Sequence, residues 1–239
     1  EKLTSSTFKG FLLGLGVTLI IQSSSATTVM VVGFVNSGLM TLHQATGVIM
    51  GANLGTSVTA WLLSTSGIQG EGILQLFKPE SFAPLFAFIG IILYMFQKNR
   101  KRQDIGLIFI CFGVLMIGME LMADSVKPLA DSPTFQSVLL KFANPIIGVL
   151  VGTIFTAVIQ SSSASVGILQ AFSLTGVVSY SVAIPIIVGQ NIGTCVSAMI
   201  SSIGAGKNAR RASFVHLYFN IIAAIIILPL FYLVSAFVS

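Results

Sequence analysis

Apolar residues gather into long continuous segments along this chain, and polar or charged residues fall mostly between them. A helix needs about 20 apolar residues to cross a hydrocarbon core of about 30 Å, and a transmembrane barrel would instead show alternating segments of about ten residues. The pattern therefore predicts an all-α integral membrane protein, with apolar segments at residues 8–35, 41–64, 82–96, 105–122, 146–175, 179–202 and 213–237.

The first segment carries a polar interruption at its centre. Gln22 is followed by three consecutive serines, Ser23 to Ser25, with apolar runs on both sides. As helices, the limbs at residues 10–21 and 26–35 would measure roughly 18 and 15 Å, about half a bilayer each. Unpaired backbone in hydrocarbon costs several kcal/mol per group, so such a tip must face protein or a polar cavity. These lengths predict a re-entrant helical hairpin over residues 8–35.

The sequence repeats itself at an offset of 138 residues. Residues 10–64 align without a gap with residues 148–202, and 21 of the 55 aligned positions are identical. Gln160 and the serines Ser161 to Ser163 fall on the first polar tip, which predicts a second hairpin over residues 146–175. A two-copy membrane repeat is typical of pseudo-symmetric transporters, whose binding site lies between the copies.

Basic residues indicate how the two repeats are oriented. If both tips belong to hairpins, three crossings separate them and the repeats are inverted, which places nine of the twelve Lys and Arg residues on one side. If both segments are straight spans, the division is eight to four and the two densest basic clusters lie on opposite faces. The positive-inside tendency favours the hairpins. We therefore expect inverted-topology repeats, a cytoplasmic basic side and a multi-pass protein of the cell membrane, specifically a bacterial inner membrane.

A second motif follows each tip by about thirty residues. The sequences GANLGT and GQNIGT, at residues 51–56 and 189–194, place two glycines around an asparagine in mid-span. Because glycine weakens a helix by about 1 kcal/mol, the motif predicts broken transmembrane helices at residues 41–64 and 179–202, with Thr56 and Thr194 opening the second halves. The alternative is that these small residues allow close packing of helices in the membrane.

These segments divide the chain into five parts. The repeat cores occupy residues 1–66 and 146–204, and each contains one hairpin and one broken helix. We expect a loop and two transmembrane helices at residues 67–123, an extracellular loop at 124–145 and a last transmembrane helix at 205–239. Each hairpin returns to its face of entry, so residues 36–42 should be cytoplasmic and residues 174–180 should lie outside.

The polar tips suit small ions. The serines Ser24, Ser25, Ser162 and Ser163 stand before apolar runs, where hydroxyls cap free N–H groups and the positive end of the helix dipole attracts an anion. The limb before each tip ends in free carbonyls, which together with a glutamine side-chain oxygen suit a small hard cation. Each tip can therefore serve ions of both signs.

Composition excludes several functional classes. Hydrophobic residues make up 54% of the chain and charged residues 8%, which is not the composition of a soluble domain. The net charge of +5 comes largely from short clusters beside apolar segments, which indicate membrane topology rather than nucleic-acid binding. Cys111 and Cys195 lack a paired spacing, so they indicate neither a disulfide nor a metal site. The sequence contains no nucleotide-binding loop or catalytic constellation, and we expect no enzymatic activity.

The doubled QSSS, each followed by G-x-N-x-G-T, resembles the bacterial and animal type II sodium/phosphate cotransporters over nearly the whole chain. The resemblance implies sodium-driven import of inorganic phosphate by alternating access, with phosphate between the two tips and the two broken helices. It implies sodium as the coupling ion, no other cofactor and a lipid bilayer around the protein. The implied phosphate ligands are Gln22, Ser23, Ser24, Ser25, Gln160, Ser161, Ser162 and Ser163. The implied sodium ligands are Gln22, Asn53, Thr56, Gln160, Asn191 and Thr194.

Three further residues are candidates for the site. Gln190 lies in the second motif, and Arg211 heads the last helix, where it could attract phosphate toward the cytoplasmic vestibule. Asn220 shares a helical face with His216, for which packing or hydrogen bonding is the favoured role. Transport of another oxyanion, a passive anion channel and a homodimeric assembly remain open, whereas the lack of a convincing intramembrane acid argues against proton coupling.

Overall fold

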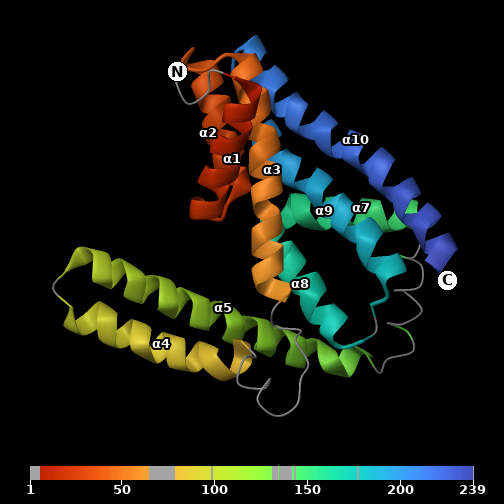
Figure 1. Cartoon of the computed structure of the whole chain (residues 1–239). Coiled ribbons are helices and arrows are strands. Elements are labelled where there is room, and N and C mark those ends of the chain that lie inside the picture. Colours follow the sequence, from red (N-terminus) through yellow and green to blue (C-terminus); the bar gives the residue numbers. More distant parts are fainter. Residues whose placement is uncertain are drawn as a thin grey trace. The chain divides into compact units, whose positions relative to one another are not determined.

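The fold is built from helices throughout the part of the chain that the structure, a computed structural model, describes: residues 6–64, 79–97, 99–130, 134, 142, 144–176 and 178–238. The predicted all-helical architecture is confirmed for these residues (Figure 1). The helices are α1 (Thr7–Ile21), α2 (Ser24–Asn36), α3 (Leu42–Ser64), α4 (Pro79–Phe96), α5 (Arg100–Ala130), α7 (Pro145–Ile159), α8 (Ser162–Leu174), α9 (Tyr180–Ser201) and α10 (Lys207–Val238).

The helices fall into two units. Unit 1 comprises Glu1–Ala60, Gln136–Val166 and Val178–Ser239, and unit 2 comprises Trp61–Phe135 and Gly167–Val177. The division falls within α3 and α8. All the candidate site residues named from the sequence belong to unit 1, including both QSSS segments and both G-x-N-x-G-T motifs.

Both QSSS segments interrupt a helix, as predicted. Helix α1 ends at Ile21 and α2 begins at Ser24, while α7 ends at Ile159 and α8 begins at Ser162. Figure 1 shows α1 and α2 side by side, with the chain reversing between them. The helix–break–helix segments are therefore present, while their re-entry into a bilayer and the inversion of the repeats stay predictions.

Glycines allow α1 and α3 to touch at the backbone. A Cβ placed on Gly14 would lie 2.0 Å from the backbone oxygen of Val48, and one on Gly51 would lie 1.9 Å from the backbone oxygen of Phe11. These separations are far inside van der Waals contact, so no side chain fits at either position. The contact therefore depends on glycine on both helices, the same device by which small residues bring membrane helices close together.

The predicted break of the two helices at G-x-N-x-G-T is wrong. Helix α3 is continuous from Leu42 to Ser64, and α9 is continuous from Tyr180 to Ser201. In the second motif a Cβ on Gly189 would lie 2.1 Å from a backbone oxygen of α7. The glycines thus serve close packing, the alternative interpretation, because a missing side chain that weakens an isolated helix also lets a neighbouring backbone approach it.

The buried core of unit 1 joins α2, α3 and α10. Aliphatic side chains of α2 and α3 interlock, and small alanines at the start of α10 pack against them, in a cluster of Val31, Val32, Val35, Ala45, Val48, Ile49, Ala209 and Ala212. Helix α10 also contacts α9, and α2 contacts α9. Elements of the two sequence repeats are therefore packed together within this unit.

Unit 2 contains the antiparallel pair α4 and α5 (Figure 1). Close backbone contact again relies on glycine, since a Cβ on Gly90 would lie 2.6 Å from the Gly106 oxygen. Aromatic rings also pack between the two helices, with Phe86 and Phe109 stacked at 5.1 Å between centroids. Helix α5 continues to Ala130, so the loop predicted at residues 124–145 begins later than expected. Much of that loop, and the loop residues 67–78, lie outside the described residues.

Two of the described helices are long and apolar enough to cross a bilayer, Tyr180–Ser201 and Lys207–Phe237. Large apolar side chains are exposed along several helices; Val158 of α7 is 78% exposed and Ile225 of α10 is 67% exposed. Such surfaces are costly in water and favourable in hydrocarbon.

Candidate ion-binding site

The first break is held by Gln22 in a left-handed backbone conformation. Its φ is 57°, an uncommon value for a residue with a side chain, and its N–H donates to the Thr18 carbonyl at 2.7 Å to end α1. Helix α2 then starts with Ser23 as its N-cap, whose Oγ accepts from the Ala26 N–H at 3.2 Å. A C-cap and an N-cap thus meet within two residues, which places the end of one helix dipole beside the start of another.

The second break repeats this geometry 138 residues later. Gln160 also has a φ of 57° and donates its N–H to the Thr156 carbonyl at 2.7 Å. Ser161 Oγ accepts from the Ala164 N–H at 3.2 Å. In both breaks the first serine is the cap, not the second or third, because each helix begins at the second serine, inside the polar triplet, and not after it as the apolar pattern indicates.

The second serine of each triplet is buried with an unused hydroxyl. Ser24 is 4% exposed and Ser162 is 8% exposed. Within the part of the chain that the structure describes, neither Oγ has a protein hydrogen-bond partner. Each lies in the first turn of its helix, where backbone N–H groups lack intrahelical acceptors. These hydroxyls and N–H groups are the kind of donors that an oxyanion requires.

A buried hydroxyl pair joins the helices on either side of each break. Thr18 Oγ1 donates to Thr27 Oγ1 at 3.2 Å, and Thr156 Oγ1 lies 2.8 Å from Ser165 Oγ. Sequence reasoning missed these contacts, although Thr18 and Thr156 are identical between the repeats. The pairs link the two helices beside each serine triplet.

The two glutamines of the breaks differ in their surroundings. Gln22 Nε2 donates to the Leu19 carbonyl at 2.7 Å, and its Oε1 accepts from Thr59 Oγ1 of α3 at 2.5 Å. Gln160 is exposed. The first break is therefore tied to α3, and the amide oxygen of Gln22 already has one donor.

The asparagine of the first motif is the centre of a buried hydrogen-bond network. Asn53 Oδ1 lies 3.2 Å from His216 Nε2 and accepts from Asn220 Nδ2 at 3.3 Å. Asn220 Nδ2 also lies 3.3 Å from Cys195 Sγ of α9, and His216 is fully buried. The network joins α3, α9 and α10, which agrees with the hydrogen-bonding role favoured for His216 and Asn220. In this arrangement the Asn53 oxygen is directed at nitrogen groups rather than at a cation.

The second motif presents buried oxygens with spare lone pairs. Thr194 is buried, and its Oγ1 donates to the Gln190 carbonyl at 2.9 Å, which leaves the hydroxyl oxygen able to accept. Gln190 is 1% exposed; its Nε2 donates to the Ser165 carbonyl at 3.1 Å, whereas its Oε1 is buried without a partner among the described residues. A buried amide oxygen without a donor costs free energy unless a water or a cation meets it.

The remaining candidates occupy more open positions. Thr56 is partly buried and donates to the Ala52 carbonyl at 3.4 Å, while Asn191 and Arg211 are exposed. No hydrogen bond between described residues joins the two breaks to each other. The structure thus connects the first break to α3 and the second break to α9, and α10 connects α3 with α9.

Comparison with known sequences decides the family. A family model described as Na+/Pi-cotransporter matches the chain over residues 1–124 and again over residues 114–236. The chain belongs to the Na+/Pi-cotransporter family. Membership confirms the resemblance suggested by the doubled QSSS and places the protein among membrane transporters.

Relatives of this Na+/Pi-cotransporter family member come from bacteria and animals. The "Putative inorganic phosphate export protein YjbB" of Escherichia coli is 30% identical over 94% of the chain, which spans 39% of that protein's length. "Uncharacterized protein YqeW" of Bacillus subtilis is 27% identical over 99% of the chain and 73% of its own length. "Sodium-dependent phosphate transport protein 2A" of Rattus norvegicus is 39% identical over 37% of the chain and 15% of its own length. No solved structure matches the chain.

Proposed function

We propose that the protein is a sodium-coupled secondary transporter that imports inorganic phosphate by alternating access. The observation that carries the proposal is the pair of serine-capped breaks, each with a buried second serine at a helix start whose hydroxyl has no partner among the described residues. Family membership and the name of the rat relative support the ions, phosphate and sodium.

Phosphate would bind at the two helix starts. Ser24 and Ser162 would donate their hydroxyls, and the first backbone N–H groups of α2 and α8 would add donors and a partial positive charge. Neither helix contains a lysine or an arginine. A divalent anion among neutral donors is only partly compensated, so a nearby cation would lower the cost of binding it.

Sodium would supply that charge. Gln190 Oε1 and Thr194 Oγ1 are buried oxygens on α9, and Gln190 also contacts Ser165 beside the second break. Amide and hydroxyl oxygens are suitable ligands for a small hard cation. Asn53 would become a ligand only after its oxygen exchanges His216 and Asn220 for the ion. We infer that this exchange accompanies the change between states of the transporter.

The proposed topology predicts where two turns lie. If both break segments are re-entrant hairpins, a cysteine replacing Ser37 should be cytoplasmic and one replacing Ser179 should face outward. Both positions are exposed, so an impermeant thiol reagent can reach them in a background lacking Cys111 and Cys195. We expect intact cells to be labelled at position 179 only. Labelling of position 37 from outside would contradict the hairpin of the first repeat.

Sodium dependence should change when the motif asparagines are removed. Asn53→Ala and Asn191→Ala should raise the sodium concentration that gives half-maximal phosphate binding, with partial recovery at high sodium. Coupling is reciprocal, so sodium must raise phosphate affinity by the factor by which phosphate raises sodium affinity. Calorimetry of phosphate binding across a sodium series measures this.

The two variants differ in how much of the packing they disturb. Because Asn53 joins a buried network, its variant should also lose about 1 to 3 kcal/mol of stability, whereas exposed Asn191 should not. Equal phosphate affinity in sodium and in choline, for the wild type and both variants, would contradict the proposed coupling between sodium binding and phosphate binding.

Export is the second candidate, favoured by the name of the Escherichia coli relative. In a sodium/phosphate symporter, an inward sodium gradient drives phosphate into the cell. An exporter would instead move phosphate out of the cell. Another oxyanion or a passive anion channel would use the same breaks, but the channel would not depend on sodium.

Phosphate flux into proteoliposomes distinguishes these functions. Vesicles with an inward sodium gradient should accumulate radiolabelled phosphate above its external concentration, and vesicles with an equal potassium gradient should not. Equal uptake under both gradients would favour the channel. Efflux from loaded vesicles that is faster than sodium-driven uptake under physiological gradients would favour export.

A further inference from the structure

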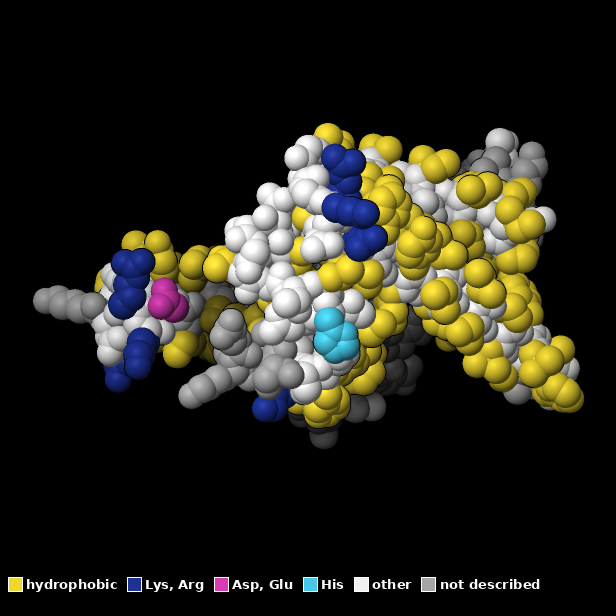
Figure 2. Space-filling view, turned by 90° about the horizontal axis from the view of Figure 1, so that it is seen from above, with side chains coloured by type: hydrophobic (Ala, Val, Ile, Leu, Met, Phe, Trp, Pro, Cys, Tyr) yellow, Lys and Arg dark blue, Asp and Glu magenta, His cyan; other side chains and the backbone are white. Residues whose placement is uncertain are grey.

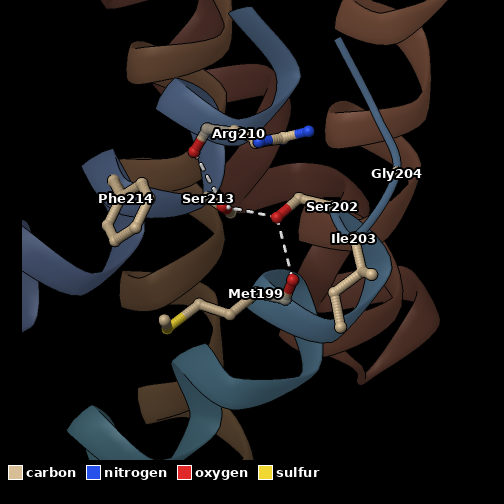
Figure 3. A pocket seen from close by; sticks show the side chains of 7 residues that line it. All are labelled: Met199, Ser202, Ile203, Gly204, Arg210, Ser213 and Phe214. Carbon is tan, nitrogen blue, oxygen red and sulfur yellow. Dashed lines mark hydrogen bonds between the residues drawn. The ribbon is translucent and has the colours of Figure 1, made fainter. Parts of the chain in front are cut away.

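A pocket of about 380 Å³ opens at the turn between α9 and α10, within unit 1. Figure 3 shows its lining, which combines one arginine and two serines with apolar side chains: Met199, Ser202, Ile203, Gly204, Arg210, Ser213 and Phe214. The proposed phosphate and sodium ligands do not line it. The pocket is therefore separate from the candidate ion-binding site.

The polar side of the pocket is held in place by hydrogen bonds. Ser202 Oγ donates to the Met199 carbonyl at 2.8 Å, and Ser213 Oγ lies 3.0 Å from Ser202 Oγ and 2.8 Å from the Arg210 carbonyl. Arg210 Nε donates to the Ala205 carbonyl at 3.1 Å. This bond orients the guanidinium and leaves its Nη groups, four N–H donors, for an anion.

The apolar side of the pocket is open to the surroundings. Ile203 is 77% exposed and Phe214 is 43% exposed. The turn joins the two helices that are long and apolar enough to cross a bilayer, so with both helices spanning the bilayer it would lie at a membrane surface. Figure 2 shows Lys and Arg side chains along the start of α10, directly beside apolar side chains. The pocket thus combines a cationic rim with an apolar wall at the level of lipid headgroups.

We propose that this pocket binds the phosphate group of an anionic phospholipid. Arg210 contacts the lipid phosphate, and an acyl chain lies along Ile203 and Phe214. A free phosphate ion would gain nothing from the exposed apolar wall, whereas a phospholipid uses both sides of the pocket. Basic pockets between transmembrane helices at the cytoplasmic face are known sites for anionic headgroups. The proposal depends only on the membrane location of α9 and α10 and not on sodium-coupled transport.

Two neighbouring arginines provide a matched comparison. Arg210 lines the pocket and Arg211 does not, although both are exposed and both stand in the first turns of α10. Arg210→Gln and Arg211→Gln remove the same charge at nearly the same depth. A general attraction of basic residues to anionic lipid predicts equal effects, whereas a specific pocket predicts unequal ones.

Native mass spectrometry of the delipidated full chain with added dioleoylphosphatidylglycerol tests the proposal. We expect Arg210→Gln to weaken binding of the first lipid by about tenfold, as for loss of a hydrogen bond to a charged group, and Arg211→Gln to change it less than twofold. Phe214→Ser should also weaken binding, which a site for the headgroup alone would not show. Inorganic phosphate at millimolar concentration should not displace the lipid.

Three results would overturn the proposal. Equal loss of lipid in the two arginine variants would indicate nonspecific attraction. Displacement of the lipid by inorganic phosphate would assign the pocket to the free ion. Unchanged lipid binding in both Arg210→Gln and Phe214→Ser would show that the pocket does not bind the lipid. If Arg210→Gln fails to elute as a single folded species, Phe214→Ser decides. Weaker lipid binding in Phe214→Ser would support the specific pocket, and unchanged binding would indicate nonspecific attraction.

Discussion

Ser24→Ala and Ser162→Ala should each weaken phosphate binding by about ten- to a hundredfold, because loss of a hydrogen bond to a charged group costs roughly 1.5 to 3 kcal/mol. Both serines are buried at helix starts, and their hydroxyls have no hydrogen-bond partner among the described residues. Their removal therefore takes a donor from the ligand without leaving a protein group unpaired. Calorimetry in saturating sodium measures the change.

The fold should survive both exchanges, since alanine is the best helix former and the first serine of each triplet still caps the helix. Ser37→Ala is the matched control, because Ser37 is exposed beyond the other end of α2, where its Oγ donates to the Phe34 carbonyl at 3.2 Å. Phosphate affinity in the control should equal that of the wild type. Wild-type affinity in both second-serine variants would contradict their assignment as ligands.

Gly14→Ala should destabilise the protein by several kcal/mol, while Gly16→Ala in the same helix should not. A Cβ at position 14 would lie 2.0 Å from the Val48 backbone oxygen, whereas one at position 16 would meet nothing within 4 Å. Overpacking a tight interface costs typically 1 to 3 kcal/mol, and here the obstacle is backbone, which cannot rotate away.

Gly16→Ala should be neutral or slightly stabilising, by up to about 1 kcal/mol, because alanine has the higher helix propensity. Thermal unfolding in detergent, followed by the fraction of protein that elutes as a monodisperse species, compares the two variants. If they unfold at the same temperature, the close contact of α1 with α3 is not the packing on which this unit depends.

The sequence alone was sufficient to locate the two helix breaks. A polar QSSS within an apolar segment is a local signal, and the capping groups of Gln22 and Ser23 lie within a few residues of the break they make. The 138-residue repeat placed the second break at the position equivalent to the first. The same motifs indicated the family that the comparisons confirm. The capping signals depend on residues close together in the chain, and the repeat is read by comparing two local patterns, so neither requires a knowledge of tertiary contacts.

The tertiary structure alone decided what the glycines of the G-x-N-x-G-T motifs and Asn53 do. Glycine weakens a helix and also permits close packing, and the sequence does not say which effect dominates; the backbone of α1 against Gly51 shows that it is packing. The partners of the Asn53 side-chain oxygen are more than 160 positions away on α10. Thr18 and Thr27 are brought together only when the chain reverses between them. Such contacts arise from packing between distant segments, which hydrophobic periodicity and local capping signals do not encode.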